Sequence, residues 1–248
     1  MATSSYYNDP DFSYTKYWQG RDYEHQSEIM ALNKLLAGSH FTSGADIGGG
    51  YGRLIPTLAH YCQKIVLVEP SQKQRRQAKD VKTINGTSEN TELPDSSLDL
   101  VSIVRVLHHL PDPTQTLSEL HRILKPNGVL VLEFANSIHI LARIKSLITG
   151  QTISRLPVER RRPVNIRRGS IPFVNHHPEV IFKLLNSSGF KIKKTLSVSN
   201  FRSPFLKKIL PLKLLLVLES ISQSLFSNLY FGPSIFVLAY KVDNLPNL

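Results

Sequence analysis

Residues 45–53 read ADIGGGYGR, an apolar strand end that runs directly into three glycines at alternating positions. Glycine tolerates a positive φ and lets a ligand approach the backbone, and a helix N-terminus offers free N–H groups with partial positive charge. Gly48, Gly50 and Gly52 are spaced as G-x-G-x-G, whereas a dinucleotide fingerprint is G-x-G-x-x-G and would need glycine in place of Arg53. The loop therefore predicts a ligand-binding turn and disfavours NAD and FAD.

A second signal follows about 20 residues later, where Glu69 ends the strand-like run KIVLVEP. A carboxylate there can accept hydrogen bonds from both hydroxyls of a ribose. Asp46 precedes the first glycine, and its charge would complement a cationic ligand and repel a pyrophosphate. S-adenosylmethionine, with its sulfonium and amino groups, is a ligand of this kind.

Short apolar runs alternate with segments of helical period through the middle of the chain, which predicts a doubly wound α/β sheet of mostly parallel strands. Ligands bind at the carboxyl ends of the strands in such sheets. The expected strands are 44–47, 64–68, 81–84, 98–104 and 128–134, and the expected helices between them are 53–61, 72–79 and 113–124.

We expect a single domain over residues 1–248. An N-terminal cap, 1–42, contains an aromatic stretch at 6–18 and an amphipathic helix at 25–36, and we expect it to fold over the mouth of the site. The cofactor-binding core is 43–136, and a basic lid or substrate insertion follows at 137–175, read as a helix and then an exposed loop. Residues 176–248 complete the sheet, with a helix at 177–188, a strand from 190 and a closing strand at 234–242.

The net positive charge of the protein comes wholly from the second half of the chain. Residues 1–136 have a net charge of −2 and residues 137–248 a net charge of +13. This favours an anionic partner, namely a phosphorylated or carboxylated substrate, RNA or a membrane surface, unless the basic face is merely solvated. Arginines without interleaved aromatic residues at 155–169 favour phosphate or carboxylate recognition. The leucine-rich stretch 205–226 suits either a membrane surface or the core, and the core is the expectation.

The single cysteine, Cys62, cannot form an internal disulfide, and the first residues lack the basic and apolar regions of a secretory signal. Both observations favour the cytoplasm. Adjacent histidines alone do not predict a metal site, and none is expected.

Four motifs in order, ADIGGGYG, VEP, NGTSENTELPDSSLDLVSIVRVLHHLPDP and LHRILKPNGVLVLEF, resemble the class I S-adenosylmethionine-dependent methyltransferases of the small-molecule type over residues 43–136. The resemblance implies a Rossmann-like, seven-stranded sheet whose last strand is antiparallel. It also implies S-adenosylmethionine as cofactor, with the glycine loop and Asp46 around its methionine part and Glu69 on its ribose. Thr87, Ser88 and Glu89 would border the adenine, although Thr87 stands where the family most often has an acidic residue.

Methyl transfer from a sulfonium needs alignment more than a catalytic residue. His108 and His109 follow the fourth strand and could supply a general base, or they could simply cap or pack the turn. Arg105, at the end of that strand, is expected either to face the cofactor pocket or to pair with a carboxylate.

The predicted function is methyl transfer to an O, C or N atom of a small anionic acceptor, such as a sugar, a lipid-linked intermediate or another metabolite. The alternatives are an RNA methyltransferase that uses the basic face and a non-catalytic S-adenosylmethionine-binding module. Nucleic-acid base methylation has no motif support, because no N-P-P-Y motif follows the fourth strand and Cys62 lies away from the strand ends.

Overall fold

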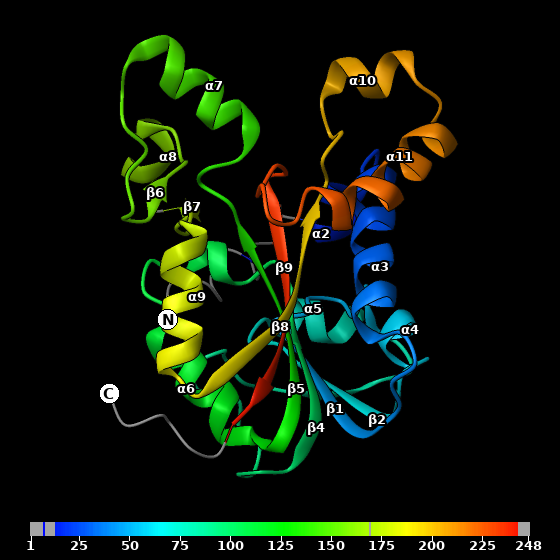
Figure 1. Ribbon diagram of the computed structural model, residues 1–248. Coiled ribbons are helices and arrows are strands. Elements are labelled where there is room, and N and C mark those ends of the chain that lie inside the picture. The colour runs from blue at the N-terminus through cyan, green and yellow to red at the C-terminus, as the bar shows by residue number, and fades with distance from the viewer. Residues whose placement is uncertain (1–6, 8–12, 169, 243–248) are drawn as a thin grey trace.

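A seven-stranded sheet in the order β3-β2-β1-β4-β5-β9-β8 forms the centre of the computed structural model, which describes residues 7, 13–168 and 170–242 (Figure 1). Neighbouring strands are parallel except where β9 pairs antiparallel with β5 and β8. This confirms the doubly wound fold and the antiparallel closing strand. The strands are β1 (Phe41–Ile47), β2 (Cys62–Val68), β3 (Lys82–Ile84), β4 (Leu98–Ile103), β5 (Leu124–Ala135), β8 (Phe190–Val198) and β9 (Ser234–Lys241).

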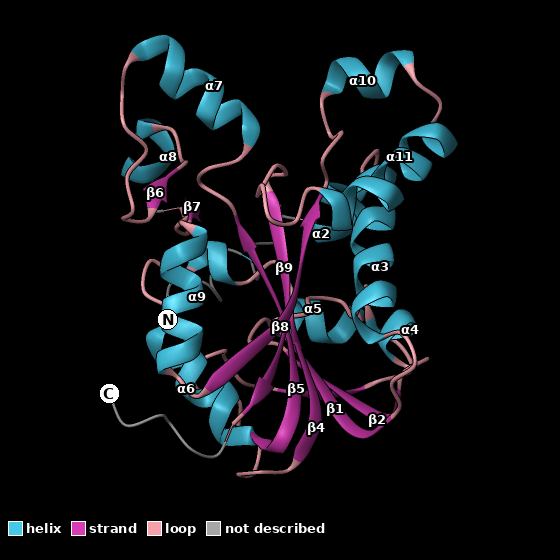
Figure 2. Cartoon of the chain, in the orientation of Figure 1, coloured by secondary structure: helices cyan, strands magenta, loops and turns pink. Residues whose placement is uncertain are grey.

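Helices cover both faces of the sheet (Figure 2). On one face, α6 (Thr114–Ile123) and α9 (Pro178–Ser187) bury Leu120 and Leu185 against the strands. On the other, α3 (Asp22–Leu36) and α4 (Ile55–Leu58) bury apolar side chains such as Leu32 against Leu100 and Phe236. The core also contains the helices α2 (Tyr14–Trp18) and α5 (Gln72–Gln77) and the short 3-10 helix η1 (Leu107–His109).

The helix expected at 53–61 is shorter than the sequence pattern suggested. Gly52 has a φ of +82°, its N–H donates to the Gly49 carbonyl and its own carbonyl accepts from Ile55. The glycine loop thus continues as turns, and only Ile55–Leu58 is helical. The other core elements lie within a few residues of their predicted ends.

The segment after β5 begins with α7 (Ile140–Thr149). It continues as an irregular stretch that contains β6 (Val158–Glu159), α8 (Pro163–Arg167) and β7 (Val174–Asn175), with β6 and β7 paired as a small antiparallel ribbon.

Residues 205–226 form α10 (Pro204–Ile209) and α11 (Leu212–Leu225). The expectation that their apolar side chains pack in the core is wrong, because most of them are exposed. Among the described residues, no helix combines the length and apolar character that crossing a membrane requires.

Candidate functional site

A cavity of about 770 Å³ lies at the carboxyl ends of β1, β2 and β4, where a parallel sheet places its ligands. Its wall brings together most of the residues singled out in the sequence, whereas Asp46, Gly52 and His108 lie outside this wall. The predicted residues in the wall are Gly48, Gly50, Glu69, Thr87, Ser88, Glu89, Arg105 and His109.

The glycine loop is tied to the predicted acidic residue. Gly48 and Gly50 have φ values of +68° and +61°, which glycine alone adopts without strain. The Gly50 N–H donates to one Glu69 carboxylate oxygen over 3.0 Å, and the Ser71 N–H donates to the other over 2.8 Å. Glu69 is buried, and this burial raises its pKa. The carboxylate is therefore held in a fixed orientation at the end of β2.

Asp46 lies beneath the loop rather than in the cavity wall. A Cβ on Gly49 would come within 2.2 Å of Asp46 Oδ2, so the carboxylate packs directly against the loop backbone. Neither carboxylate oxygen has a hydrogen-bond partner at bonding distance among the described residues. Burial raises the pKa of Asp46 to about 7, although the neighbouring Ser102 hydroxyl and the Arg53 charge partly oppose the shift. A buried carboxylate in this state is stabilised by a nearby cation.

The turn at 87–89 forms the opposite wall. The Thr87 side-chain oxygen accepts from the Asn90 N–H over 3.1 Å, so this hydroxyl helps to close the turn. Ser88 is buried and donates to the Glu89 carboxylate over 3.0 Å. Glu89 therefore places a carboxylate in the cavity wall, two residues after the position where the resemblance leads one to look for it.

Several wall residues were not named individually from the sequence, and Gln74, Tyr7 and Tyr14 are among them. Gln74, on α5, is buried with neither amide atom hydrogen-bonded within the described structure, and it lines the cavity. Tyr7 and Tyr14 reach the cavity from the N-terminal segment, and Tyr14 lies against the place that a Cβ on Gly50 would occupy. The aromatic composition of 6–18 was the available signal. The other residues of that stretch before Ser13, namely 6 and 8–12, lie outside the described residues.

A second cavity of about 380 Å³ adjoins the first and shares Tyr7, Tyr14, Arg105 and His109 with it. Its far wall comes from the basic insertion. The residues that line only this second cavity are Tyr17, His108, Arg160, Arg161, Arg162, Asn165, Ser170, Ile171 and Phe173.

The two histidines differ in what holds them. His109 Nδ1 lies 2.8 Å from the Pro172 carbonyl, which can only accept, so Nδ1 carries the proton. Burial lowers the pKa of His109, which leaves a neutral ring whose Nε2 accepts from the Tyr7 hydroxyl over 2.7 Å. Both nitrogens of His109 are therefore engaged. His108 packs against His109 and Phe173 in tilted ring contacts, with ring-centre distances of 4.0 and 4.7 Å, and it faces the second cavity.

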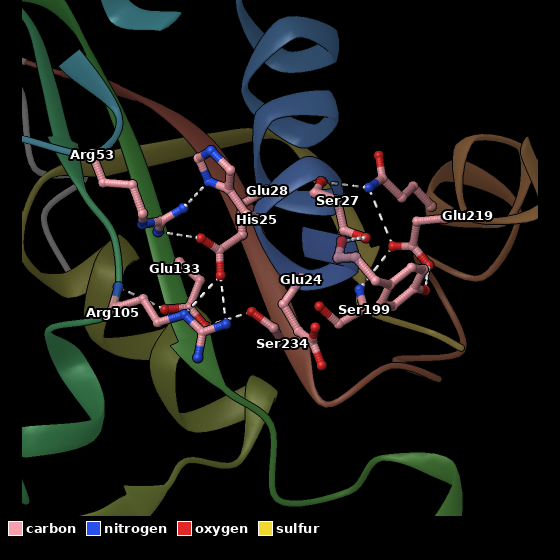
Figure 3. Close-up of polar contacts among 12 residues, drawn as sticks. Glu24, His25, Ser27, Glu28, Arg53, Arg105, Glu133, Ser199, Glu219 and Ser234 are labelled. Atoms are coloured by element: carbon pink, nitrogen blue, oxygen red, sulfur yellow. Dashed lines mark hydrogen bonds and ion pairs between the residues drawn. The ribbon is translucent and has the colours of Figure 1, made fainter. Parts of the chain in front are cut away.

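Arg105 both faces the cavities and pairs with carboxylates (Figure 3). Its side chain binds Glu28 of α3, and the distance from Arg105 Nη2 to Glu28 Oε1 is 2.5 Å. The Arg105 backbone N–H donates to the Glu133 carboxylate over 2.9 Å. The other oxygen of Glu28 binds Arg53, whose guanidinium lies 3.7 Å above the Trp18 ring. This network fastens α3 to the glycine loop and to the ends of β4 and β5.

The profile of a family described as a methyltransferase domain matches residues 45–132, which contain the glycine loop, Glu69, the turn at 87–89 and the histidine pair. Residues 45–132 therefore form a methyltransferase domain, and the fold is that of the S-adenosylmethionine-dependent methyltransferase family. The cofactor of this family is S-adenosylmethionine.

Relatives of this methyltransferase differ in their substrates. It is 25% identical over 174 residues to the tRNA 5-carboxymethoxyuridine methyltransferase of Escherichia coli, covering 65% of each chain. It is 27% identical over 136 residues to the ubiquinone/menaquinone biosynthesis C-methyltransferase of Escherichia coli, covering 44% of this chain and 54% of that protein. The first of the curated relatives are matched over only about a third of their own length, at 34%, 29% and 38%.

The fold also matches a crystal structure of an S-adenosylmethionine-dependent methyltransferase from Mesorhizobium loti. The TM-score is 0.60 at 18% identity, with 87% of this chain and 98% of that chain covered. At this identity the likeness concerns the fold.

The residues of the first cavity fit this cofactor. S-adenosylmethionine carries positive charge and a ribose. The cavity wall offers a fixed carboxylate at the end of β2, and a second, buried carboxylate without hydrogen-bond partners among the described residues lies directly behind the glycine loop. The unsatisfied amide of Gln74 adds a buried hydrogen-bonding group at the same wall.

Proposed function

We propose that this methyltransferase moves the methyl group of S-adenosylmethionine to an O, C or N atom of a small anionic acceptor. The cofactor would occupy the first cavity and the acceptor the second. The observation that carries the proposal is that the two cavities share one wall and that the second is lined by Arg160, Arg161 and Arg162.

In this proposal Asp46 and the glycine loop hold the charged methionine part of the cofactor and Glu69 holds the ribose. Thr87, Ser88 and Glu89 border the adenine, and Gln74 lies beside the glycine loop on the side of Glu69. The sulfonium supplies an activated methyl group, so the protein has chiefly to align donor and acceptor and to exclude water. Tyr7 and Tyr14, which border both cavities, would enclose the junction between them.

The arginines of the second cavity are not equivalent. Arg161 is bound to Glu159 and to the Ser170 carbonyl, so it holds the insertion together. Arg160 and Arg162 are exposed and form no ion pair with any described residue. Two unpaired guanidinium groups at a cavity wall suit a carboxylate or phosphate, which they can bind through paired hydrogen bonds.

If the acceptor must lose a proton, His108 is better placed than His109 to receive it. Both nitrogens of His109 are engaged within the protein, whereas His108 faces the second cavity. Burial lowers the pKa of His108 well below its ordinary value, so the ring is neutral at physiological pH but a weak base. A negatively charged acceptor beside the ring would raise this pKa and strengthen the base.

Neutralising the two unpaired arginines is expected to impair acceptor use selectively. The Arg160→Gln, Arg162→Gln double variant should raise KM about tenfold or more for an anionic acceptor, because each lost charge-assisted hydrogen bond costs about 1.5–3 kcal/mol. The assay measures S-adenosylhomocysteine formed from matched acceptor pairs, each with a free and an amidated carboxyl or with and without a phosphate.

The matched control is Arg167→Gln, Arg168→Gln, which removes the same charge from neighbouring exposed positions outside the cavity wall. It should leave KM unchanged. Equal effects of the two double variants, or no preference for the anionic member of any pair, would remove the second cavity from the proposal.

The affinity for S-adenosylmethionine should rise with pH through about 7. Asp46 has a pKa of about 7 before the cofactor binds, so it is protonated below that pH. A cation above the loop favours the carboxylate, so binding must release a proton and weaken as the pH falls from 7 to 5. Calorimetry in two buffers with different ionisation enthalpies counts the protons released. Asp46→Asn should abolish the release, and a release that persists in this variant would exclude Asp46 as its source.

RNA methylation is the second candidate, because the relative with the longest of the reported alignments is named for a tRNA substrate. A basic face that binds phosphates would show an affinity for tRNA that falls steeply with salt. Turnover of a small acceptor without tRNA would decide for the first candidate. Tight cofactor binding without turnover of either acceptor class would indicate a non-catalytic binding module.

A further inference from the structure

Helix α7 exposes an apolar face that no described part of the chain covers. It has no buried residue. Leu141, Ile144 and Ile148 recur at the i, i+3, i+7 spacing that places side chains on one face of a helix, and Leu147 borders them. Leu147 and Ile148 are 83% and 80% exposed, an unusual state for leucine and isoleucine in a regular helix.

Helix α11 buries polar side chains and exposes apolar ones, which is the reverse of an ordinary surface helix. Three of its four buried residues are polar, namely Glu219, Ser222 and Gln223. Its outward face carries a stripe at helical spacing in which Ile221 and Leu225 are 63% and 67% exposed. The full stripe is Leu214, Val217, Leu218, Ile221 and Leu225.

The buried polar residues of α11 form hydrogen bonds with other parts of the chain, and of their side-chain atoms only Gln223 Oε1 has no partner among the described residues, so the fold holds this face inward. The Glu219 carboxylate accepts from the Ser199 backbone N–H over 2.7 Å (Figure 3). It also accepts from the Tyr23 hydroxyl over 2.6 Å and from the Asn200 backbone N–H over 2.9 Å. Gln223 donates to the Ser27 carbonyl over 2.8 Å. Turning the apolar stripe inward would break these bonds, so the leucine-rich face is held outward.

Charge around these apolar faces has one sign. Residues 140–156 contain no Asp or Glu, and they carry Arg143, Lys145 and Arg155, of which Arg155 pairs with Glu179. Residues 204–226 contain one acidic residue, the fully buried Glu219, together with three lysines, of which Lys207 pairs with Glu24. The exposed surface of both segments is therefore apolar and basic, which complements anionic lipid better than it complements a second copy of itself.

The two segments project from the same end of the sheet. Helix α7 follows β5, and α10 and α11 follow β8, and these parallel strands end at one edge (Figures 1 and 2). In the figures α7 and α10 stand at the top, on either side of the start of β9. This is also the edge at which both cavities lie, and α7 leads directly into the arginines of the second cavity.

We propose that α7 and the α10–α11 pair form a docking surface for an anionic lipid membrane. The apolar side chains enter the boundary between headgroups and acyl chains, and the lysines and arginines contact lipid phosphates. RNA is disfavoured because these faces carry leucine and isoleucine side chains that are up to 83% exposed. Docking rests on these faces and not on methyl transfer, so it can fail while the proposed function stands.

The test is co-sedimentation of the full chain with vesicles of neutral phosphatidylcholine and of phosphatidylcholine mixed with phosphatidylglycerol. The parent is expected to bind the anionic vesicles and to bind the neutral ones much more weakly. The variants Leu147→Gln, Ile148→Gln and Ile221→Gln, Leu225→Gln should each weaken binding about tenfold or more, because each removes two inserting side chains without changing charge.

The control for nonspecific charge is Lys64→Gln, Lys82→Gln, on exposed positions of β2 and β3. It should bind like the parent, whereas Lys145→Gln, Lys213→Gln should bind less. Equal binding by parent and apolar variants would overturn the proposal. Parent protein that binds no vesicle but forms a dimer in analytical ultracentrifugation, which the apolar variants abolish, would also overturn it and assign the faces to self-association.

Discussion

Gly50→Arg is expected to abolish binding of S-adenosylmethionine. Gly50 has a φ of +61°, and a Cβ there would come within 2.8 Å of Tyr14 Cε1, so any side chain adds backbone strain and displaces the aromatic wall. An arginine would also fill the first cavity and oppose a cationic ligand. Because the side chain would occupy space that the cofactor needs and place a like charge beside it, we expect an affinity loss of about 100-fold or more, which corresponds to about 3 kcal/mol. Calorimetric titration measures this loss.

Gly38→Arg is the matched control. Gly38 also has a positive φ, +75°, but a Cβ there would meet no atom within 4 Å. The control thus carries similar backbone strain and the same added charge away from the loop, and it should bind the cofactor like the parent. Retained binding by Gly50→Arg would mean that the cofactor does not approach the glycine loop.

Glu28→Ala is expected to give the largest loss of stability. Glu28 is 1% exposed and is shared by Arg53 and Arg105, so its removal leaves two guanidinium groups without their common partner. Breaking a buried ion pair from one side costs about 3–5 kcal/mol. Urea unfolding followed by circular dichroism measures the free energy of unfolding.

The control for Glu28 is Asp95→Ala, which removes an exposed partner of Arg122 and should cost less than about 1 kcal/mol. Burial tends to raise the pKa of Glu28, but Arg105 and Arg53 outweigh it and hold the pKa below its ordinary value. The stabilisation by Glu28 is therefore present at neutral pH and lost as the pH falls through this lowered pKa. Equal losses in both variants would contradict the buried network.

The core of the fold could be predicted because its determinants are local. Most of the core strands are short apolar runs, and the glycine loop indicates a turn with backbone conformations that most other residues do not adopt. Glu69 could be placed because the residue at the end of a parallel strand must lie at the ligand edge. In the structure, Glu69 lies with Gly48 and Gly50 in one cavity wall, as a position at the carboxyl end of a parallel strand requires.

The rest depends on contacts between distant segments. Tyr7 and Tyr14 precede the core by some tens of residues, and only the folded chain brings them to the cavity. Glu28 and Arg105 are 77 residues apart, so their pairing has no local signature. Hydrophobic periodicity predicted a buried face for 205–226 because a leucine stripe normally packs inward. It could not show that Glu219 finds its partners inside and turns the stripe outward.

The central claim is that the first cavity binds S-adenosylmethionine through Asp46, the glycine loop and Glu69. The most direct measurement is parallel calorimetric titration of the parent and of Glu69→Ala with S-adenosylmethionine, S-adenosylhomocysteine and NAD. We expect the parent to bind the first two in the micromolar range and not NAD, and Glu69→Ala to bind them about 1–3 kcal/mol more weakly through the lost charge-assisted hydrogen bonds. Binding of NAD, or unchanged affinity in Glu69→Ala, would contradict the account.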